Sequence, residues 1–286
     1  MTRLLTLVLL LAALVVAACG GDDDEQAAEQ PAATAQADAC RPGELQTKRR
    51  GTLTVATDKP AYPPYFENDD PANGRGFESA VAYAIADELG FARDEVTWTV
   101  VPFNASYAPG PKDFDFDVNQ ISITPERARQ VDFSEPYFSA PQAVVLPERS
   151  SLETVTSIDD LANAKIGVQV GTTSLDAVRE VVRPNDDPQV YNDSNDVVQA
   201  LKQNRVDAVV VDLPTAFYLT AAQVEGSRIA GQFEAPGGDR WGALLEKDSQ
   251  LTPCVSAAIR RLRDSGELDR LEDRWLGEAA GAPKLD

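Results

Sequence analysis

The 286-residue sequence contains no histidine, only three cysteines, and far fewer basic than acidic side chains. Without histidine, Ser-His-Asp and Cys-His catalysis are excluded, as are zinc and iron sites that need an imidazole ligand. Lys and Arg number 26 against 46 Asp and Glu, a net charge of −20. This balance argues against nucleic acid as a partner, because a binder needs basic side chains to displace counterions from phosphates. A phosphate-cradling glycine-rich loop is also missing, and we expect no cofactor and no metal.

The N-terminus predicts an exported chain. Arg3 and a short apolar run over residues 4–16 form a signal sequence that is too short to span a membrane comfortably. The letters "VAAC" at residues 16–19 resemble the lipobox of bacterial lipoproteins, which implies that residues 1–18 are removed and that Cys19 carries a lipid. The alternative is an ordinary secretory signal that happens to precede a cysteine. Residues 20–39 lack a periodic apolar face, and we expect residues 19–50 to tether the folded body to the membrane.

The two remaining cysteines, Cys40 and Cys254, suit an oxidising compartment. In an exported domain such a pair more often forms a disulfide than two free thiols. We therefore predict a Cys40–Cys254 bridge between the start of the folded body and its C-terminal helices, with two separate thiols as the alternative.

Strands and helices alternate along the body. Hydrophobic spacing, glycine stops and β-branched runs predict an α/β protein with largely parallel sheets. The predicted strands are residues 52–57, 95–101, 165–170 and 206–211, with a further one around 115–121. The predicted helices are residues 77–90, 171–182, 197–205 and 214–223, and two more, broken near Gly266, within 254–277.

Arg127 occupies an unusual position in the stretch "NQISITPER". Thr124 is a predicted N-cap and Pro125 suits the first helical position, so Arg127 falls near the third. The positive end of a helix dipole favours anions there. This placement suits an arginine that holds an anion. The alternative is a surface pair with Asp132 or Glu135.

Three polar clusters follow predicted strands. They are "SITPER" at residues 122–127, "GTT" at residues 171–173, and Asp212. In open α/β sheets, ligands bind outside the carboxyl ends of strands. Arg127 and the amides of Thr172 and Thr173 suit a carboxylate, and Asp212 suits an ammonium group. A ligand that carries both groups is an α-amino acid. Taken singly, each cluster has a structural explanation: Thr172 and Asp212 as helix caps, and Ser122 as a strand-end hydroxyl.

The stretches "GTLTVATD", "YPPYF", "GFESAVAYAIADELG", "SITPERARQVDFSEPYF", "IGVQVGTT" and "VDAVVVD" occur in this order. Through them, residues 51–277 resemble the family 3 solute-binding proteins, the extracytoplasmic receptors of polar amino acid ABC transporters. The resemblance implies a type II periplasmic-binding-protein fold, with two α/β lobes of mixed sheets joined by hinge strands. Lobe 1 would combine residues 51–140 with 238–277, lobe 2 would be residues 141–237, and residues 278–286 would be a tail.

The resemblance also implies roles for individual residues. Arg127 would grip the ligand carboxylate, helped by Ser122 and the amides of Thr172 and Thr173. Asp212 would hold the ammonium, with Gln120 and Ser122 nearby. Tyr62 and Phe103 match positions that sandwich the ligand side chain. The implied partners are a small amino acid, the membrane permease of an importer, and the membrane itself through Cys19; the protein would be a monomer.

Several positions depart from the family pattern. The family often has "GFD" followed by another acidic residue, whereas this chain has "GFES" with Glu78. The residues after Phe103 include Pro109, Gly110 and Pro111, which indicate a loop in place of the usual helix. Around the pocket, Asp58 favours a basic ligand side chain, whereas Asn119 and Gln120 favour an amide or another polar group. The ligand is left open.

We expect a binding protein and not an enzyme. The alternative is a lyase or hydrolase on the same fold, similar to cyclohexadienyl dehydratase, with Glu78 or Asp58 as general acid. A sensory domain is a third possibility, although no transmembrane helix or signalling module follows residue 277.

Overall fold

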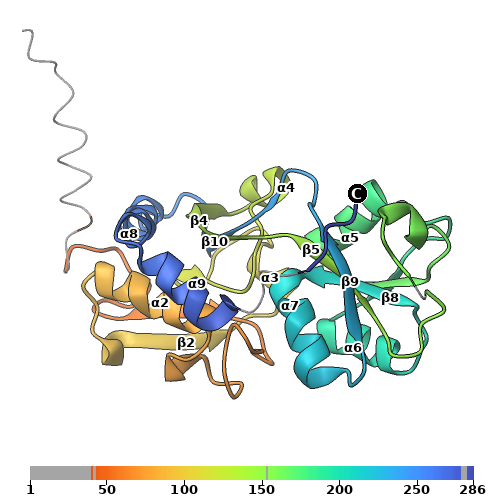
Figure 1. Cartoon of the computed structure of the whole chain (residues 1–286). Helices are drawn as coiled ribbons and strands as arrows, with labels where there is room; N and C mark the ends of the chain where they lie inside the picture. The colour runs from red at the N-terminus through yellow and green to blue at the C-terminus, as the bar shows by residue number, and fades with distance from the viewer. Residues whose placement is uncertain (1–39, 41–42, 153, 278–281) are drawn as a thin grey trace, which may run out of the picture.

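The computed structural model describes residue 40 and residues 43–152, 154–277 and 282–286. The predicted signal peptide, Cys19 and residues 20–39 lie outside the described residues. Two bodies lie side by side, one holding α2, α8 and α9 and the other holding α5, α6 and α7 (Figure 1). Each is built on its own five-stranded sheet. We call them lobe 1 and lobe 2. No helix in the described part of the chain is both long and apolar enough to cross a membrane.

The lobe 1 sheet has the strand order β2-β1-β3-β10-β4. β1 runs parallel to β2 and β3, whereas β10 is antiparallel to β3 and β4. Its strands are β1 (Leu53–Thr57), β2 (Val96–Val100), β3 (Phe116–Asp117), β4 (Asp132–Ala140) and β10 (Asp239–Leu245). Its helices are α2 (Phe77–Glu88), α3 (Phe103–Ser106), α4 (Pro125–Ala128), α8 (Thr252–Asp264) and α9 (Glu267–Leu276).

The lobe 2 sheet repeats this arrangement in the order β7-β6-β8-β5-β9. β6 is parallel to β7 and β8, and β5 is antiparallel to β8 and β9. Its strands are β5 (Gln142–Leu146), β6 (Ile166–Gln169), β7 (Gln189–Tyr191), β8 (Ala208–Asp212) and β9 (Arg228–Phe233). Its helices are α5 (Thr173–Ala177), α6 (Ser194–Lys202) and α7 (Leu213–Tyr218). π-helical turns at Val178–Val182 and Leu219–Gln223 continue α5 and α7.

Both sheets are therefore mixed, as the family resemblance implies, and not largely parallel, as the order of elements alone predicts. The difference comes from the long strands that leave one lobe for the other. The chain passes from β4 directly to β5 and returns from β9 to β10. These strands are antiparallel to their neighbours in sheets that are otherwise parallel. Local hydrophobic spacing does not reveal the direction of a strand. The predicted strand around residues 115–121 shrinks to β3, and the predicted loop after Phe103 begins with the short helix α3.

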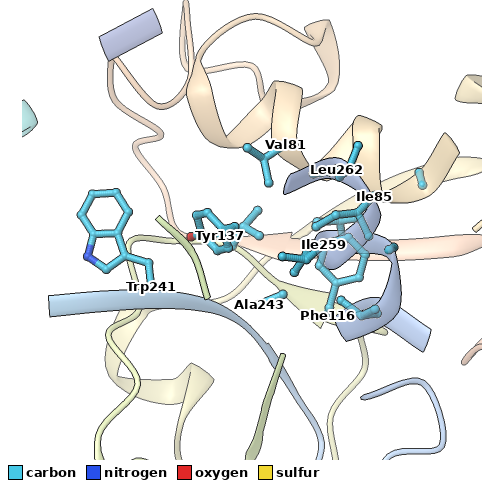
Figure 2. Close-up of a cluster of buried hydrophobic side chains, with 14 of the residues drawn as sticks. Val81, Ile85, Phe116, Tyr137, Trp241, Ala243, Ile259 and Leu262 are labelled. Carbon is cyan, nitrogen blue, oxygen red and sulfur yellow. The ribbon is translucent and has the colours of Figure 1, made fainter. Parts of the chain in front are cut away.

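Separate hydrophobic cores support the lobes. In lobe 1, α2 and α8 cover the sheet, and Val81, Ile85, Ile259 and Leu262 pack near Phe116 (Figure 2). In lobe 2, alternate residues of β5 enter cores on opposite faces of the sheet. Because this strand is buried on both sides, its sequence reads as an unbroken apolar run after Gln142.

The predicted disulfide is present. Cys40 is bonded to Cys254 on α8, across a sequence separation of 214 residues. The predicted tether, residues 19–50, includes residues 43–50, which the structure attaches to lobe 1. Lys48 N donates to Asp115 Oδ1 (2.6 Å), and the Lys48 ammonium pairs with Glu246 (2.5 Å). Contacts with residues distant in the sequence hold this segment in place, and its polar composition does not predict them.

The end of the predicted tail, residues 282–286, lies on lobe 2. Gln232 N donates to Pro283 O (2.7 Å), and Leu285 N donates to Gln232 O (2.8 Å), so the segment extends the sheet beyond β9. The Leu285 side chain is buried in the lobe 2 core. Gly231 makes room for it, since a Cβ at that position would lie 2.6 Å from Leu285 Cγ. The chain thus ends on the lobe opposite to α9, with its C-terminus near α5 in Figure 1.

Candidate functional site

A cavity of about 200 Å³ lies between the two lobes. Lobe 1 contributes the segments after β1, β2 and β3 to its wall, and lobe 2 contributes the ends of β6 and β8 and the helices α5, α6 and α7. Seven of the predicted site residues line it: Asp58, Tyr62, Phe103, Asn119, Gln120, Thr172 and Asp212. Arg127, Ser122 and Thr173 lie beside the cavity and not in its wall, although they form the contact between the lobes described next.

Arg127 is 7% exposed, and it follows the N-cap that the sequence predicts. Thr124 Oγ1 accepts a hydrogen bond from Arg127 N (3.2 Å). The guanidinium Nη1 donates to Ser122 O (2.7 Å) within lobe 1, and Nη2 donates to Gly171 O (2.8 Å) in lobe 2. Its carbon lies 4.7 Å from the centre of the Tyr107 ring. Burial lowers the pKa of Arg127, and Tyr107 is among the groups that oppose this change.

The alternative that Arg127 pairs on the surface with Asp132 or Glu135 is wrong. Asp132 is paired with Lys247 (3.1 Å), and Glu135 is paired with Arg260 (3.3 Å). Helix α4 is also only four residues long. Its dipole is therefore a smaller influence than the sequence argument assumed, and Arg127 is held mainly by the two carbonyl groups and by the aromatic rings.

Gly171 brings the two lobes close together. Its φ is +73°, and a Cβ there would lie 2.4 Å from the Tyr107 hydroxyl and 2.6 Å from Asn104 Oδ1. The next residue, Thr172, is the N-cap of α5, and its hydroxyl accepts a hydrogen bond from Leu175 N (3.2 Å). The Thr173 hydroxyl lies 3.3 Å from that of Ser122 across the lobe boundary. Thr172 is therefore a helix cap, as the structural explanation holds, and Gly171 and Thr173 on either side of it make the contacts with lobe 1.

Asp212 ends β8 and lines the cavity, but its side chain does not cap α7. Its Oδ1 accepts from Gln142 Nε2 (2.6 Å), which also donates to Asp239 Oδ2 (2.6 Å). Gln142 Oε1 in turn accepts from the Ser174 hydroxyl (2.6 Å). Burial raises the pKa of Asp212 well above its ordinary value, and the neighbouring Asp239 raises it further. A cation beside Asp212 would relieve this cost.

Two tyrosines of lobe 1 that line the cavity contact side chains of lobe 2. The Tyr62 hydroxyl donates to Asn195 Oδ1 (2.5 Å), and the Tyr65 hydroxyl lies 2.8 Å from Thr215 Oγ1. Burial raises the pKa of Tyr62 to about 12, with Asp193 adding to the rise. Sequence reasoning placed Tyr62 in the site but missed its partner and Gln142. The signal for Gln142 was its place as the polar first residue of a buried strand; none marked Asn195.

Glu78 lies beneath the cavity and not in its wall. It is fully buried, and burial raises its pKa to about 7. Asp58, in contrast, lines the cavity, and its two carboxylate oxygens accept from Lys59 N (2.6 Å) and Phe103 N (3.1 Å). Among the described residues, no group of three or more His, Cys, Asp or Glu side chains is arranged to hold a metal ion.

Two lobes, each built on a mixed β-sheet with helices, and a cavity between them are typical of a class of extracellular binding proteins. Comparison with known sequences places the chain in this class. The sequence profile of the bacterial extracellular solute-binding proteins, family 3, matches residues 53–278, and the chain belongs to this family. The L-cystine-binding protein TcyJ of Escherichia coli (strain K12) is 31% identical over 235 residues, which cover 81% of this chain and 85% of that protein.

Solved structures agree. An ancestral arginine-binding protein bound to glutamine is 32% identical, with a TM-score of 0.67, and the match covers 80% of this chain and 99% of that one. The ancestral amino acid-binding protein AncCDT-1, a precursor of cyclohexadienyl dehydratase, is 29% identical, with a TM-score of 0.65, over 79% of this chain and 95% of that one.

Proposed function

We propose that this protein captures an α-amino acid outside the cytoplasm and delivers it to an ABC importer. The observation that carries the proposal is the cavity between the lobes, which has a half-buried carboxylate, Asp212, in its wall and a buried guanidinium, Arg127, at its edge. Opposite charges held apart on the two lobes suit a zwitterion. Names of relatives point the same way, since TcyJ binds L-cystine and the ancestral structures bind arginine or glutamine.

In this proposal Arg127 holds the ligand carboxylate. A guanidinium has five N–H donors, and the bonds to Ser122 O and Gly171 O use two of its nitrogens. The hydroxyl of Ser122 and the amides of Thr172 and Thr173 assist at the same lobe boundary. Asp212 holds the ammonium from lobe 2, with Gln120 on the lobe 1 side, and Tyr62 and Phe103 contact the ligand side chain together with Asn119 and Asp58.

The wall also favours a ligand of positive charge. Asp58, Asp193 and Asp212 line the cavity, and the one basic side chain that the described residues place in its wall, Lys59, is paired with Asp69 (3.3 Å). The negative potential disfavours acidic side chains by like-charge repulsion. We therefore propose that cationic or neutral amino acids bind more tightly than acidic ones.

Binding moves the lobes in this proposal. Contacts from both lobes to one ligand stabilise the closed form by the ligand's differential affinity for it, and the β4–β5 and β9–β10 connections act as hinges. Lobe 1 comprises residues 51–140 and 238–277, and lobe 2 comprises residues 141–237. The protein works as a monomer on the outer face of the membrane, anchored by lipid at Cys19, where "VAAC" resembles a lipobox.

A lyase is the second candidate, because one solved neighbour is a precursor of a dehydratase. The buried contacts of Glu78 and the two backbone amides on Asp58 weigh against either residue as a general acid at the cavity. We propose binding without turnover. Incubation with prephenate-like compounds, followed by product analysis, separates the two functions, since a binding protein returns the compound unchanged.

Thermal-shift screening of the full chain tests the main proposal. The probes are the common L-amino acids and L-cystine, with mass spectrometry of any small molecule that copurifies. A ligand at one hundred times its Kd stabilises the fold by about 2.7 kcal/mol, which raises the melting temperature by several degrees. Amino acid binding is contradicted if every probe leaves the melting temperature unchanged and no amino acid copurifies.

A further inference from the structure

Gln120 forms part of the cavity wall, and its orientation is set from beneath by Glu78. We propose that Glu78 is a positioning residue, which turns the Gln120 side chain so that its carbonyl oxygen, and not its amino group, serves the cavity as the lobe 1 acceptor for the ligand ammonium. The inference rests on the proposed function, because it names the atom of Gln120 that meets the ligand ammonium and the residue that orients it.

The contacts of Glu78 leave little freedom. It is the second residue of α2 and is fully buried. Glu78 Oε1 accepts from Gln120 N (2.6 Å) and from the Tyr137 hydroxyl (2.5 Å). Glu78 Oε2 accepts from Gln120 Nε2. An ionised carboxylate can only accept hydrogen bonds, so the amide must present its nitrogen to Glu78 and turn its oxygen away.

The backbone of Gln120 is held by the same carboxylate. Its φ is +49°, which is uncommon for a residue other than glycine, asparagine or aspartate. Hydrogen bonds from both its main chain and its side chain to one buried group fix this conformation. The hydrogen bonds to buried Glu78 thus hold the backbone of Gln120 in the cavity wall and determine which end of its side-chain amide faces away from Glu78.

The free acceptors of the two lobes then match one ligand group. Among the described residues, no hydrogen-bond donor reaches Gln120 Oε1 or Asp212 Oδ2. Both residues line the same cavity. An ammonium carries three donors and no acceptor, so it can bond to both oxygens, whereas a hydroxyl carries one donor. The wall therefore selects an α-amino acid over the corresponding α-hydroxy acid.

A ligand-free measurement tests the orientation itself. In nuclear magnetic resonance spectra of the full chain at about pH 8, where Glu78 is ionised, one Gln120 side-chain NH₂ proton should be shifted and protected from exchange by the charged acceptor. The Gln120→Met variant identifies the signal by its loss. The isosteric Glu78→Gln variant, which can present an amino group to Gln120, should abolish the protection. A freely exchanging Gln120 amide in the wild type overturns the proposal.

Calorimetry tests the consequence for recognition. The probes are L-arginine, L-glutamine and L-glutamate, each paired with its α-hydroxy counterpart. Glu78→Gln and Gln120→Met should each reduce the preference for the amino over the hydroxy compound by about 10- to 100-fold, the effect of one charge-assisted hydrogen bond. Tyr137→Phe is the matched control, because it removes a donor to Glu78 but leaves both bonds to Gln120, and it should keep the preference within about threefold.

The outcomes of the two measurements are distinct. A preference that is unchanged in folded Glu78→Gln and Gln120→Met overturns the inference while leaving amino acid binding intact. A protein with a protected Gln120 amide that binds no amino acid overturns the proposed function and leaves the orientation of Gln120 standing.

Discussion

Replacing Arg127 by lysine keeps a positive charge at the edge of the cavity but removes the planar fork. In the structure, Nη1 and Nη2 donate to one carbonyl in each lobe, at 2.7 Å to Ser122 O and 2.8 Å to Gly171 O. A lysine ammonium is a point charge on a flexible stem and cannot serve both carbonyls and a ligand carboxylate in one plane. Arg127→Lys should therefore weaken binding, and Arg127→Ala should weaken it more.

The magnitude follows from what is lost. Breaking a buried, charge-assisted contact with the carboxylate costs about 2–5 kcal/mol, a rise in Kd of roughly thirtyfold to several thousandfold. Arg127→Ala also removes the bond to Gly171 O that links the lobes. Arg127 therefore also contributes to the contact between the lobes.

Titration calorimetry with the amino acid that gives the largest thermal shift measures the effect. Arg129→Ala is the matched control, because Arg129 lies two residues away, is exposed and pairs only loosely with Glu126 (3.6 Å). Decarboxylated amines should bind the wild type poorly and discriminate much less against Arg127→Ala. Unchanged affinity in Arg127→Ala, or an amine that binds the wild type as tightly as the amino acid, would refute the reasoning.

Further predictions concern stability. Reducing the Cys40–Cys254 bridge should lower the free energy of unfolding by up to about 5 kcal/mol, because a loop of 214 residues is released, and guanidinium melts with and without reductant measure it; superposable melts contradict the claim. Deleting residues 282–286 should lower the free energy of unfolding by about 2–4 kcal/mol, since buried Leu285 leaves the lobe 2 core. A melting temperature equal to that of the full chain would show that this contact does not stabilise the fold. Burial raises the pKa of Glu78 from 4.5 to about 7, so the folded state binds this proton more tightly than the unfolded state, and the stability is lost as pH rises from about 4.5 through 7. Urea melts at about pH 4.5 and about pH 7 measure the free energy of unfolding at each pH. Between them, Glu78→Gln should lose about 3 kcal/mol less of this free energy than the wild type, and equal losses in the two proteins contradict the assignment.

Some of the predicted site residues line the cavity, and others lie at the boundary between the lobes. Arg127, Ser122 and Thr173 meet at the lobe boundary, where backbone carbonyls and hydroxyls satisfy them. Asp212 lies within the cavity, where among the described side chains only Gln142 donates to it. Under the proposed function, the ligand carboxylate would therefore bind at the lobe boundary and its ammonium group within the cavity.

Local sequence signals predicted most of the elements and the chemistry they carry. Thr124 and Pro125 favour a helix start through their own geometry, and the "GTT" turn and Asp212 follow strands whose apolar runs can be read from the sequence. Mixed strand order, in contrast, was available only through the family resemblance. Strand direction depends on where a chain re-enters a sheet, and local periodicity does not encode it.

Which polar groups bond to each other, in contrast, depends on the tertiary fold. Gln142 joins Asp212 to Asp239, and Glu78 fixes Gln120, although 70 and 42 residues separate the members of the pairs Gln142–Asp212 and Glu78–Gln120. Residues 282–286 return to lobe 2 after helices that belong to lobe 1. Such contacts arise because burial removes water and each polar group must find a partner within the fold. A partner distant in the sequence leaves no periodic signal, so its identity follows from packing alone.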